Sequence, residues 1–207
     1  MDVRESYDSA ARAYAEHLAT ELVSKLLDRH LLNRFAEAMT GRGLVADLGC
    51  GPGHIARYLQ ERDVEIFGVD LSPEMVRVAT SLNPGIEFRT GDMKQLNMPE
   101  GSLAGAVAFY SIVHFDSAEL GVVVQQVRRV LEPGGLFLVS FHVGSQVVSV
   151  DDLFGAAVSL DFRFHLPSEV ISALQSAHLT VIEHVEREPY EGAEYPSRRC
   201  YLLARAD

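Results

Sequence analysis

A glycine-rich loop directly after a short apolar segment most constrains how this chain folds. The apolar residues Val45–Leu48 are followed by glycine at alternate positions from Gly49 to Gly53, and residues 54–60 then have a helical pattern. Glycine lets the backbone turn sharply and lets a ligand approach main-chain atoms closely. A loop between a strand and a helix is the usual ligand crevice of an open α/β sheet.

Apolar runs of strand length alternate with helical patterns through the middle of the chain. This alternation is typical of βαβ units and predicts a mostly parallel sheet. Pro133 and Gly134 give the sharpest break, because proline cannot continue a helix and glycine can adopt a left-handed conformation. We expect strands at 44–48, 64–69, 86–90, 103–110 and 135–142, and helices at 54–62, 73–81 and 117–131.

The two ends of the chain add further elements. Residues 5–40 have apolar side chains at three-to-five-residue steps and are expected to be helical. After the fifth strand we expect a helix over 167–177 and strands over 179–187 and 199–205. Residues 143–166 fit no simple period, and two interpretations stay open: a functional segment, or an extra helix that only covers the core.

The glycine spacing argues against a dinucleotide site. The dinucleotide fingerprint has glycines at relative positions 1, 3 and 6, and counting from Gly49 the sixth position is His54. Asp47 also precedes the loop, where a pyrophosphate would bring more negative charge near the carboxylate. A ligand that carries positive charge suits this loop better.

Acidic residues also follow the next two expected strands. Asp70 ends the apolar run 66–69, and it follows Gly49 by 70 − 49 = 21 residues, about the length of one helix and one strand. Asp92 follows the next expected strand. Each acid alone has an ordinary explanation as part of a turn or as a helix cap. Three acids at three consecutive strand ends form a more specific pattern.

The segment Asp47–Gly53 resembles motif I of the class I S-adenosylmethionine-dependent methyltransferases. Asp70 matches the family acid that holds the two ribose hydroxyls, and Asp92 with Met93 resembles the position that meets the adenine. The ligand of this family carries an ammonium and a sulfonium group and no phosphate, in agreement with the acidic loop. The resemblance is close over residues 41–142 and holds in outline elsewhere.

The resemblance implies a Rossmann-like α/β fold, with a seven-stranded, mostly parallel sheet, helices on both faces and an antiparallel edge hairpin. It implies a single domain over 1–207: an N-terminal helical cap (1–40), a cofactor-binding half (41–142), and an acceptor-side insertion with the C-terminal hairpin (143–207). The implied cofactor is S-adenosylmethionine, with S-adenosylhomocysteine as its product. The implied cofactor-binding residues are Tyr14, Asp47, Gly49, Cys50, Gly51, Gly53, Asp70, Leu71, Asp92, Met93 and Phe109.

The implied reaction is a one-step displacement, which needs two bound molecules held in line and shielded from water. An acceptor hydroxyl or ammonium must lose a proton, and histidine is suited to accept it near neutral pH. His114 follows the expected fourth strand, where the family places groups that face the methyl, and His142 ends the fifth. Both are candidate catalytic bases, with His165 third, and each has the alternative of a hydrogen-bonded structural histidine.

Two further features have both a functional and a structural interpretation. Tyr7 and Tyr14 lie two turns apart on one expected helix face. A similar helix closes over the cofactor in many small-molecule methyltransferases, but the same stripe can simply pack the helix onto the domain. Arg198 and Arg199 precede the last expected strand, and either can form a fork with an acceptor carboxylate or phosphate, or a surface salt bridge.

The composition of the chain limits which partners the protein can bind. The formal net charge of −11 argues against nonspecific nucleic-acid binding, because phosphate contacts need a basic surface. No apolar run approaches the roughly 20 residues that span a bilayer, and the N-terminal sequence lacks a secretory pattern. We therefore expect a cytoplasmic protein that does not bind membranes. Cys50 and Cys200 lack the spacing of a zinc site, and we expect no metal.

We therefore expect a methyltransferase that acts on a small molecule. The alternative is a binding module that holds the same cofactor and regulates a partner, because motif I reports the cofactor and not the acceptor. A nicotinamide-dependent oxidoreductase is disfavoured by His54 and Asp47. An acceptor cavity near His114 and His142 would favour the enzyme. The acceptor and the oligomeric state have no recognisable motif.

Overall fold

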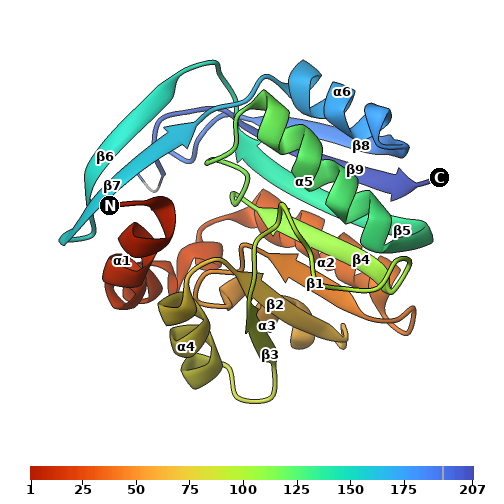
Figure 1. Ribbon diagram of the computed structural model, residues 1–207, viewed down its shortest axis with the longest axis horizontal. Helices are drawn as coiled ribbons and strands as arrows, with labels where there is room; N and C mark the ends of the chain where they lie inside the picture. Colours follow the sequence, from red (N-terminus) through yellow and green to blue (C-terminus); the bar gives the residue numbers. More distant parts are fainter. Residues whose placement is uncertain (193) are drawn as a thin grey trace.

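The computed structural model describes residues 1–192 and 194–207. Its central sheet has seven strands: β1 (Val45–Leu48), β2 (Ile66–Asp70), β3 (Glu87–Thr90), β4 (Leu103–Phe109), β5 (Leu131–His142), β8 (Leu179–Arg187) and β9 (Arg199–Ala206). Their order is β3-β2-β1-β4-β5-β9-β8 (Figure 1). β1 to β5 pair in parallel, whereas β9 is antiparallel to both β5 and β8. The predicted sheet with its antiparallel edge hairpin is confirmed.

Helices cover both faces of this sheet: α2 (Leu26–Met39), α3 (His54–Gln60) and α4 (Pro73–Leu82) on one, and α5 (Ser117–Val130) and α6 (Pro167–Ser176) on the other. The two faces have separate cores because successive side chains of a strand point to opposite sides. Val45 packs with Phe35 of α2, whereas its neighbour Ala46 belongs to the core with Val127 of α5. β1, in the middle of the sheet, is therefore buried at every position.

A separate two-stranded antiparallel sheet follows β5 and consists of β6 (Val147–Leu153) and β7 (Ala156–Arg163). The expectation that residues 143–166 have no simple period, and the alternative of an extra helix, are both wrong. Apolar and polar residues alternate from Val158 to Phe164, which is the pattern of a half-buried strand. Phe154 and Gly155 supply the turn, with φ angles of 57° and 85°.

The N-terminal region is also different from the single helix expected over 5–40. It contains α1 (Val3–Leu18), a short 3-10 helix η1 (Glu21–Val23) and then α2. α1 packs between the β6–β7 hairpin and α4, where Ala10 and Ala11 are buried in two separate clusters (Figure 1). α2 packs instead on a face of the sheet. One straight helix cannot meet both surfaces, so the chain bends between them.

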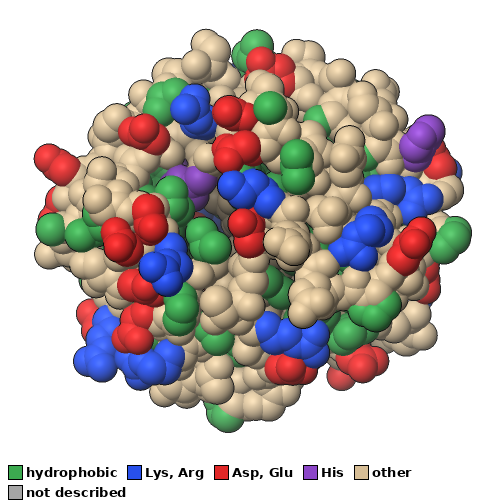
Figure 2. All heavy atoms as spheres, in the orientation of Figure 1, with side chains coloured by type: hydrophobic (Ala, Val, Ile, Leu, Met, Phe, Trp, Pro, Cys, Tyr) green, Lys and Arg blue, Asp and Glu red, His purple; other side chains and the backbone are tan. Residues whose placement is uncertain are grey.

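The surface carries mixed charges. On the face shown in Figure 2, Lys and Arg side chains lie beside Asp and Glu side chains and do not gather into a broad basic patch. Some ion pairs of the described chain are local, as between Arg77 and Glu74 and between Arg89 and Glu87. Among the described residues, no helix has the length and apolar character to cross a bilayer.

We predict that Gly68→Ala destabilises the fold by about 1–3 kcal/mol, because the new methyl group overpacks the core. A Cβ at Gly68 would lie 2.4 Å from Cδ1 of Phe88 and 2.7 Å from Sγ of Cys50. Urea unfolding of the purified variant measures the change. The matched control is Gly121→Ala in α5, where a Cβ meets nothing within 4 Å; it should stabilise the protein by about 0.5–1 kcal/mol through helix propensity. Equal effects of the two substitutions would contradict the packing argument.

Candidate functional site

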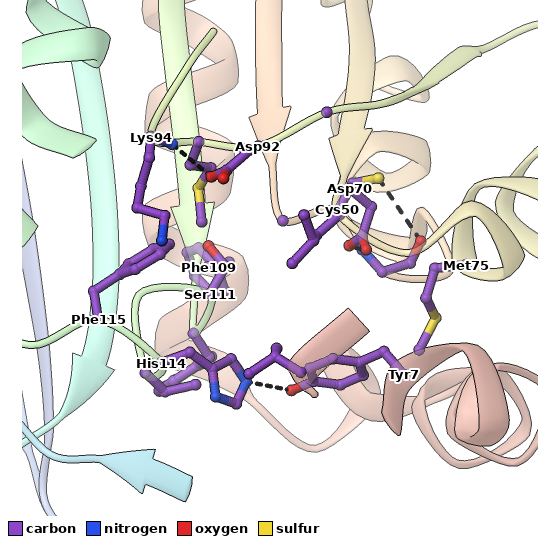
Figure 3. A pocket seen from close by; sticks show the side chains of 18 of the residues that line it. Tyr7, Cys50, Asp70, Met75, Asp92, Lys94, Phe109, Ser111, His114 and Phe115 are labelled. Atoms are coloured by element: carbon purple, nitrogen blue, oxygen red, sulfur yellow. Dashed lines mark hydrogen bonds between the residues drawn. The ribbon is translucent and has the colours of Figure 1, made fainter. Parts of the chain in front are cut away.

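A cavity of about 230 Å³ lies at the carboxyl ends of β1, β2, β3 and β4 (Figure 3). We call it the strand-end cavity. Parallel strands bring their carboxyl ends to one edge of the sheet, so residues distant in the sequence meet there. Most residues expected to contact a cofactor line it, together with one candidate base: Tyr14, Gly49, Cys50, Gly51, Asp70, Leu71, Asp92, Met93, Phe109 and His114.

The glycine loop is held against the end of β2 by backbone hydrogen bonds. The amides of Gly49 and Cys50 donate to the carbonyl of Val69 at 2.8 and 3.1 Å, and the amide of Gly51 donates to Oδ2 of Asp70 at 2.8 Å. Gly49 has a φ of 69°, and a Cβ there would lie 2.4 Å from the Cβ of Ser111. The loop can therefore approach the neighbouring strand end only because this position is glycine.

Carboxylates dominate the charge of the strand-end cavity. Asp70 and Asp92 lie on two sides of it in Figure 3, and burial raises the pKa of Asp70 above its usual range. The ammonium of Lys94 is 3.0 Å from a carboxylate oxygen of Glu119, so it is already paired. A cation with hydrogen-bond donors fits this surface better than a phosphate. Within the described chain, no three His, Cys, Asp or Glu side chains are grouped to hold a metal ion.

Asp47 and Gly53, both expected to contact the cofactor, do not line the strand-end cavity. Asp47 is 1% exposed beneath the loop, and its Oδ2 accepts a hydrogen bond from the amide of Ala56 at 3.1 Å. Burial raises the pKa of Asp47 to about 7. Gly53 has a φ of 80°, and a Cβ there would lie 2.6 Å from Cζ of Phe88. Both residues shape the loop from below.

A second cavity of about 550 Å³ adjoins the first, and we call it the hairpin cavity. The residues that line both cavities mark their boundary: Tyr7, Tyr14, His54, Phe109, Tyr110 and Val113. The β6–β7 hairpin and the segment after it supply an apolar and aromatic wall, made of Val148, Val150, Leu153, Phe154, Phe162 and Phe164. The hairpin missed in the sequence is thus a wall of a large cavity beside the strand-end cavity.

His114 lies at the edge of the strand-end cavity and joins three elements. Its Nδ1 is 3.0 Å from the carbonyl oxygen of Asp161 in β7, and its Nε2 is 2.8 Å from the hydroxyl of Tyr7 in α1 (Figure 3). A carbonyl only accepts hydrogen bonds, so Nδ1 carries the proton and Nε2 accepts from Tyr7. Burial lowers the pKa of His114, which keeps the ring neutral.

His142 lines the hairpin cavity instead. Its ring stacks on Phe164, and its Nδ1 is 2.7 Å from Oγ of Ser197. Burial, together with the charges of Arg199 and Lys25, lowers the pKa of His142 to about 4. His165 lines neither cavity; its Nε2 is 3.1 Å from the carbonyl of Ile112, as in a structural histidine.

The sequence interpretation missed several polar residues that line the hairpin cavity. Nε2 of His54 is 2.9 Å from Oε2 of Glu21, and Lys25 also pairs with this glutamate. Although burial raises it, these two partners lower the pKa of Glu21 to about 2. Only His54 stands within the glycine motif and could have been found there. Glu21 and Lys25 lie in the bend between α1 and α2 and have no local pattern.

Tyr110 has the backbone strain that often marks functional sites. Its φ of 54° is rare for a residue with a large side chain. The hydroxyl is 2.7 Å from that of Tyr201 and 3.3 Å from Oδ1 of the fully buried Asp28. This network fixes the ring between the two cavities.

The comparisons with known proteins agree with this geometry. A family model described as a methyltransferase domain matches residues 45–135. The malonyl-[acyl-carrier protein] O-methyltransferase of Serratia marcescens is 31% identical over 51% of this chain and 41% of its own length. The enzyme of the same name from Salmonella typhimurium is 28% identical over 80% of this chain and 64% of its own length. The chain thus spans less than two thirds of these relatives.

A likeness to a solved structure covers almost the whole chain. Magnesium protoporphyrin IX methyltransferase from Synechocystis, solved with bound SAM, superposes with a TM-score of 0.74 at 17% identity. The match covers 99% of this chain and 95% of that one. At this identity the likeness concerns the fold.

The buried Asp47 should make stability depend on pH. Its pKa is raised in the folded state, so its contribution is complete below pH 4 and is lost as pH rises toward 7. We predict that Asp47→Asn removes this loss, so the unfolding free energy of the variant relative to wild type rises by about 2–4 kcal/mol between pH 4 and pH 8. Denaturant unfolding across this range measures it. Parallel pH curves for the two proteins would contradict the prediction.

Proposed function

We propose that the chain is a class I S-adenosylmethionine-dependent methyltransferase, and that it transfers the methyl group of S-adenosylmethionine to a small-molecule acceptor. The observation that carries the proposal is the pair of adjoining cavities with a shared aromatic boundary. A module that only binds the cofactor needs the first cavity, whereas transfer needs a second one that opens toward the methyl group. The hairpin cavity therefore favours the transferase.

We assign the strand-end cavity to the cofactor. The loop from Gly49 to Gly51 would hold the amino-acid end, Asp70 the ribose, and Asp92 with Met93 the adenine. The excess of carboxylates in this cavity suits a cationic ligand. When bound, S-adenosylmethionine supplies a methyl group on a sulfonium, which a nucleophile displaces in line. We thus propose residues 41–142 as the cofactor-binding part of a single domain.

The protein's own contribution is to hold two molecules in register and to exclude water. Two hydrogen bonds connect three elements beside the boundary of the cavities. The hydroxyl of Tyr7 in α1 is bonded to His114 in the segment after β4, and His114 is bonded to the carbonyl of Asp161 in the β6–β7 hairpin. His142 lines the hairpin cavity and is uncharged near neutral pH; it can accept an acceptor's proton, but only as a weak base, because its pKa is about 4. His114 can do so only when its bond to Tyr7 opens.

The size of the hairpin cavity supports a free small molecule as acceptor, since cavities of about 300–1,000 Å³ are typical for such ligands. Two of the relatives are methyltransferases of a malonyl group on an acyl-carrier protein. An acceptor delivered by a carrier protein is therefore the second candidate. Nucleic acid is disfavoured by the net charge of −11. A cytoplasmic location stays a prediction.

We predict that Asp70→Ala weakens binding of S-adenosylmethionine and S-adenosylhomocysteine by about 1–3 kcal/mol, because hydrogen bonds to the ribose are lost. Isothermal titration calorimetry measures both ligands. Glu65→Ala is the matched control, because Glu65 is an exposed acid just before the opposite end of β2. An affinity of Asp70→Ala equal to that of the control would refute the assignment of Asp70.

The same pair of variants tests the transfer itself. The wild type and Glu65→Ala, incubated with isotopically labelled S-adenosylmethionine and a cell extract, should form a labelled product heavier by one methyl group. Asp70→Ala should form much less of it. Tight binding of the cofactor with no labelled product in any extract fraction would favour the binding module.

α1 should close over the bound cofactor. Tyr7 and Tyr14 of α1 line the strand-end cavity, so a ligand there adds contacts to this helix. We predict that S-adenosylhomocysteine slows hydrogen exchange in residues 3–18 at least tenfold, measured by mass spectrometry, because α1 opens less often. Residues 167–176 of α6, on the sheet away from the cavity, serve as the internal control. Unchanged exchange in α1 would show that it only packs onto the domain.

A further inference from the structure

The two arginines before the last strand have different environments. Arg199 begins β9 opposite His142 of β5, is 3% exposed and lines the hairpin cavity. Its neighbour Arg198 has a side chain 52% exposed and pairs with Glu186 at 2.5 Å and Glu188 at 3.3 Å. The two interpretations of this pair are thus separated: Arg198 forms the surface salt bridge, and Arg199 faces the cavity.

The guanidinium of Arg199 is incompletely satisfied. Its Nη1 donates to the carbonyl of Tyr195 at 2.7 Å and to Oγ of Ser197 at 3.0 Å, which fixes the orientation of the group. Its Nε is buried and has no hydrogen-bond partner among the described residues; the nearest acidic oxygen, on Glu194, is 3.7 Å away. A buried charged donor without a partner is costly, so a site that keeps one is suited to an anionic ligand.

Glu194 cannot readily supply the missing partner. Its carboxylate already accepts two hydrogen bonds from Arg187, at 2.6 and 2.8 Å, and one from the amide of Tyr190 at 2.8 Å. Although burial raises it, the bonds from Arg187 lower the pKa of Glu194 to about 2. In addition, the ammonium of Lys25 lies 3.3 Å from this carboxylate. Turning Glu194 toward Arg199 would break these contacts.

Arg199 therefore offers an incompletely paired cation to the hairpin cavity, whereas the ammonium of Lys25 is held by Glu21 and Glu194. The wall formed by the β6–β7 hairpin is apolar and largely aromatic. The cavity thus offers one cationic end and an apolar body, which is the complement of an organic acid.

We propose that the methyl acceptor is a small carboxylic acid with an aromatic or similarly apolar body, and that Arg199 binds its carboxylate. The inference rests on the proposed function and names the acceptor class of the same site. The planar guanidinium matches a carboxylate in shape and charge. The ammonium of Lys25 is already held by Glu21 and Glu194, so we assign the carboxylate to Arg199.

The test compares acids with neutral molecules of the same shape. The probes are 3-phenylpropanoate and 2-naphthoate, each against its primary amide, titrated by calorimetry into protein saturated with S-adenosylhomocysteine. We expect each acid to bind wild type at least tenfold more tightly than its amide. Arg199→Gln should abolish this preference, and the matched control Arg198→Gln should keep it.

The wild-type comparison is decisive even if Arg199→Gln unfolds. Arg199→Lys gives a second variant that keeps the charge and loses the fork, and it should retain only part of the preference. Equal binding of acids and amides, no binding of any probe, or a preference that survives Arg199→Gln would overturn the inference. These results leave the proposed function intact if S-adenosylhomocysteine binds. Failure to bind it would overturn both.

Discussion

The hydrogen bond from the amide of Gly51 to the carboxylate of Asp70 ties together the parts on which the site depends. It joins the loop after β1 to the end of β2, and the bonds from Gly49 and Cys50 to Val69 reinforce it. Asp47 holds the start of α3 from beneath the same loop. These bonds hold the loop and the neighbouring strand ends together, so the carboxylates there have fixed positions.

The second constraint is the placement of α1. Asp8 of α1 accepts hydrogen bonds from Ser72 and the amide of Glu74 at the start of α4, and Ser6 accepts one from the amide of Ser159 in β7. α1 therefore connects the start of α4, beside the central sheet, to the β6–β7 hairpin. Both cavities depend on it, because Tyr7 and Tyr14 line each of them.

The sequence predicted the features that depend on local pattern. Strand and helix periods gave the parallel sheet, and the glycine loop with the acids after β2 and β3 gave most of the strand-end cavity. The hairpin was also encoded, as an alternation from Val158 to Phe164 that was overlooked. The hairpin cavity was beyond such reasoning, because its polar contacts join residues far apart in the chain. His142 in its wall is 55 positions from its partner Ser197, and Tyr7 at the boundary is 107 positions from its partner His114. No periodicity reports such contacts.

The two cavities differ in charge, and this difference has a consequence for the proposed reaction. The strand-end cavity has an excess of carboxylates, whereas Arg199 brings an incompletely paired cation to one end of the hairpin cavity. A cationic donor and an anionic acceptor would each be drawn to their own cavity and also to each other across the aromatic boundary. Since mostly aromatic side chains line that boundary, the attraction between the two molecules is stronger there than in bulk water. Charge would then order the ternary complex, leaving histidine only the proton to manage, and an acceptor already ionised would need no base at all.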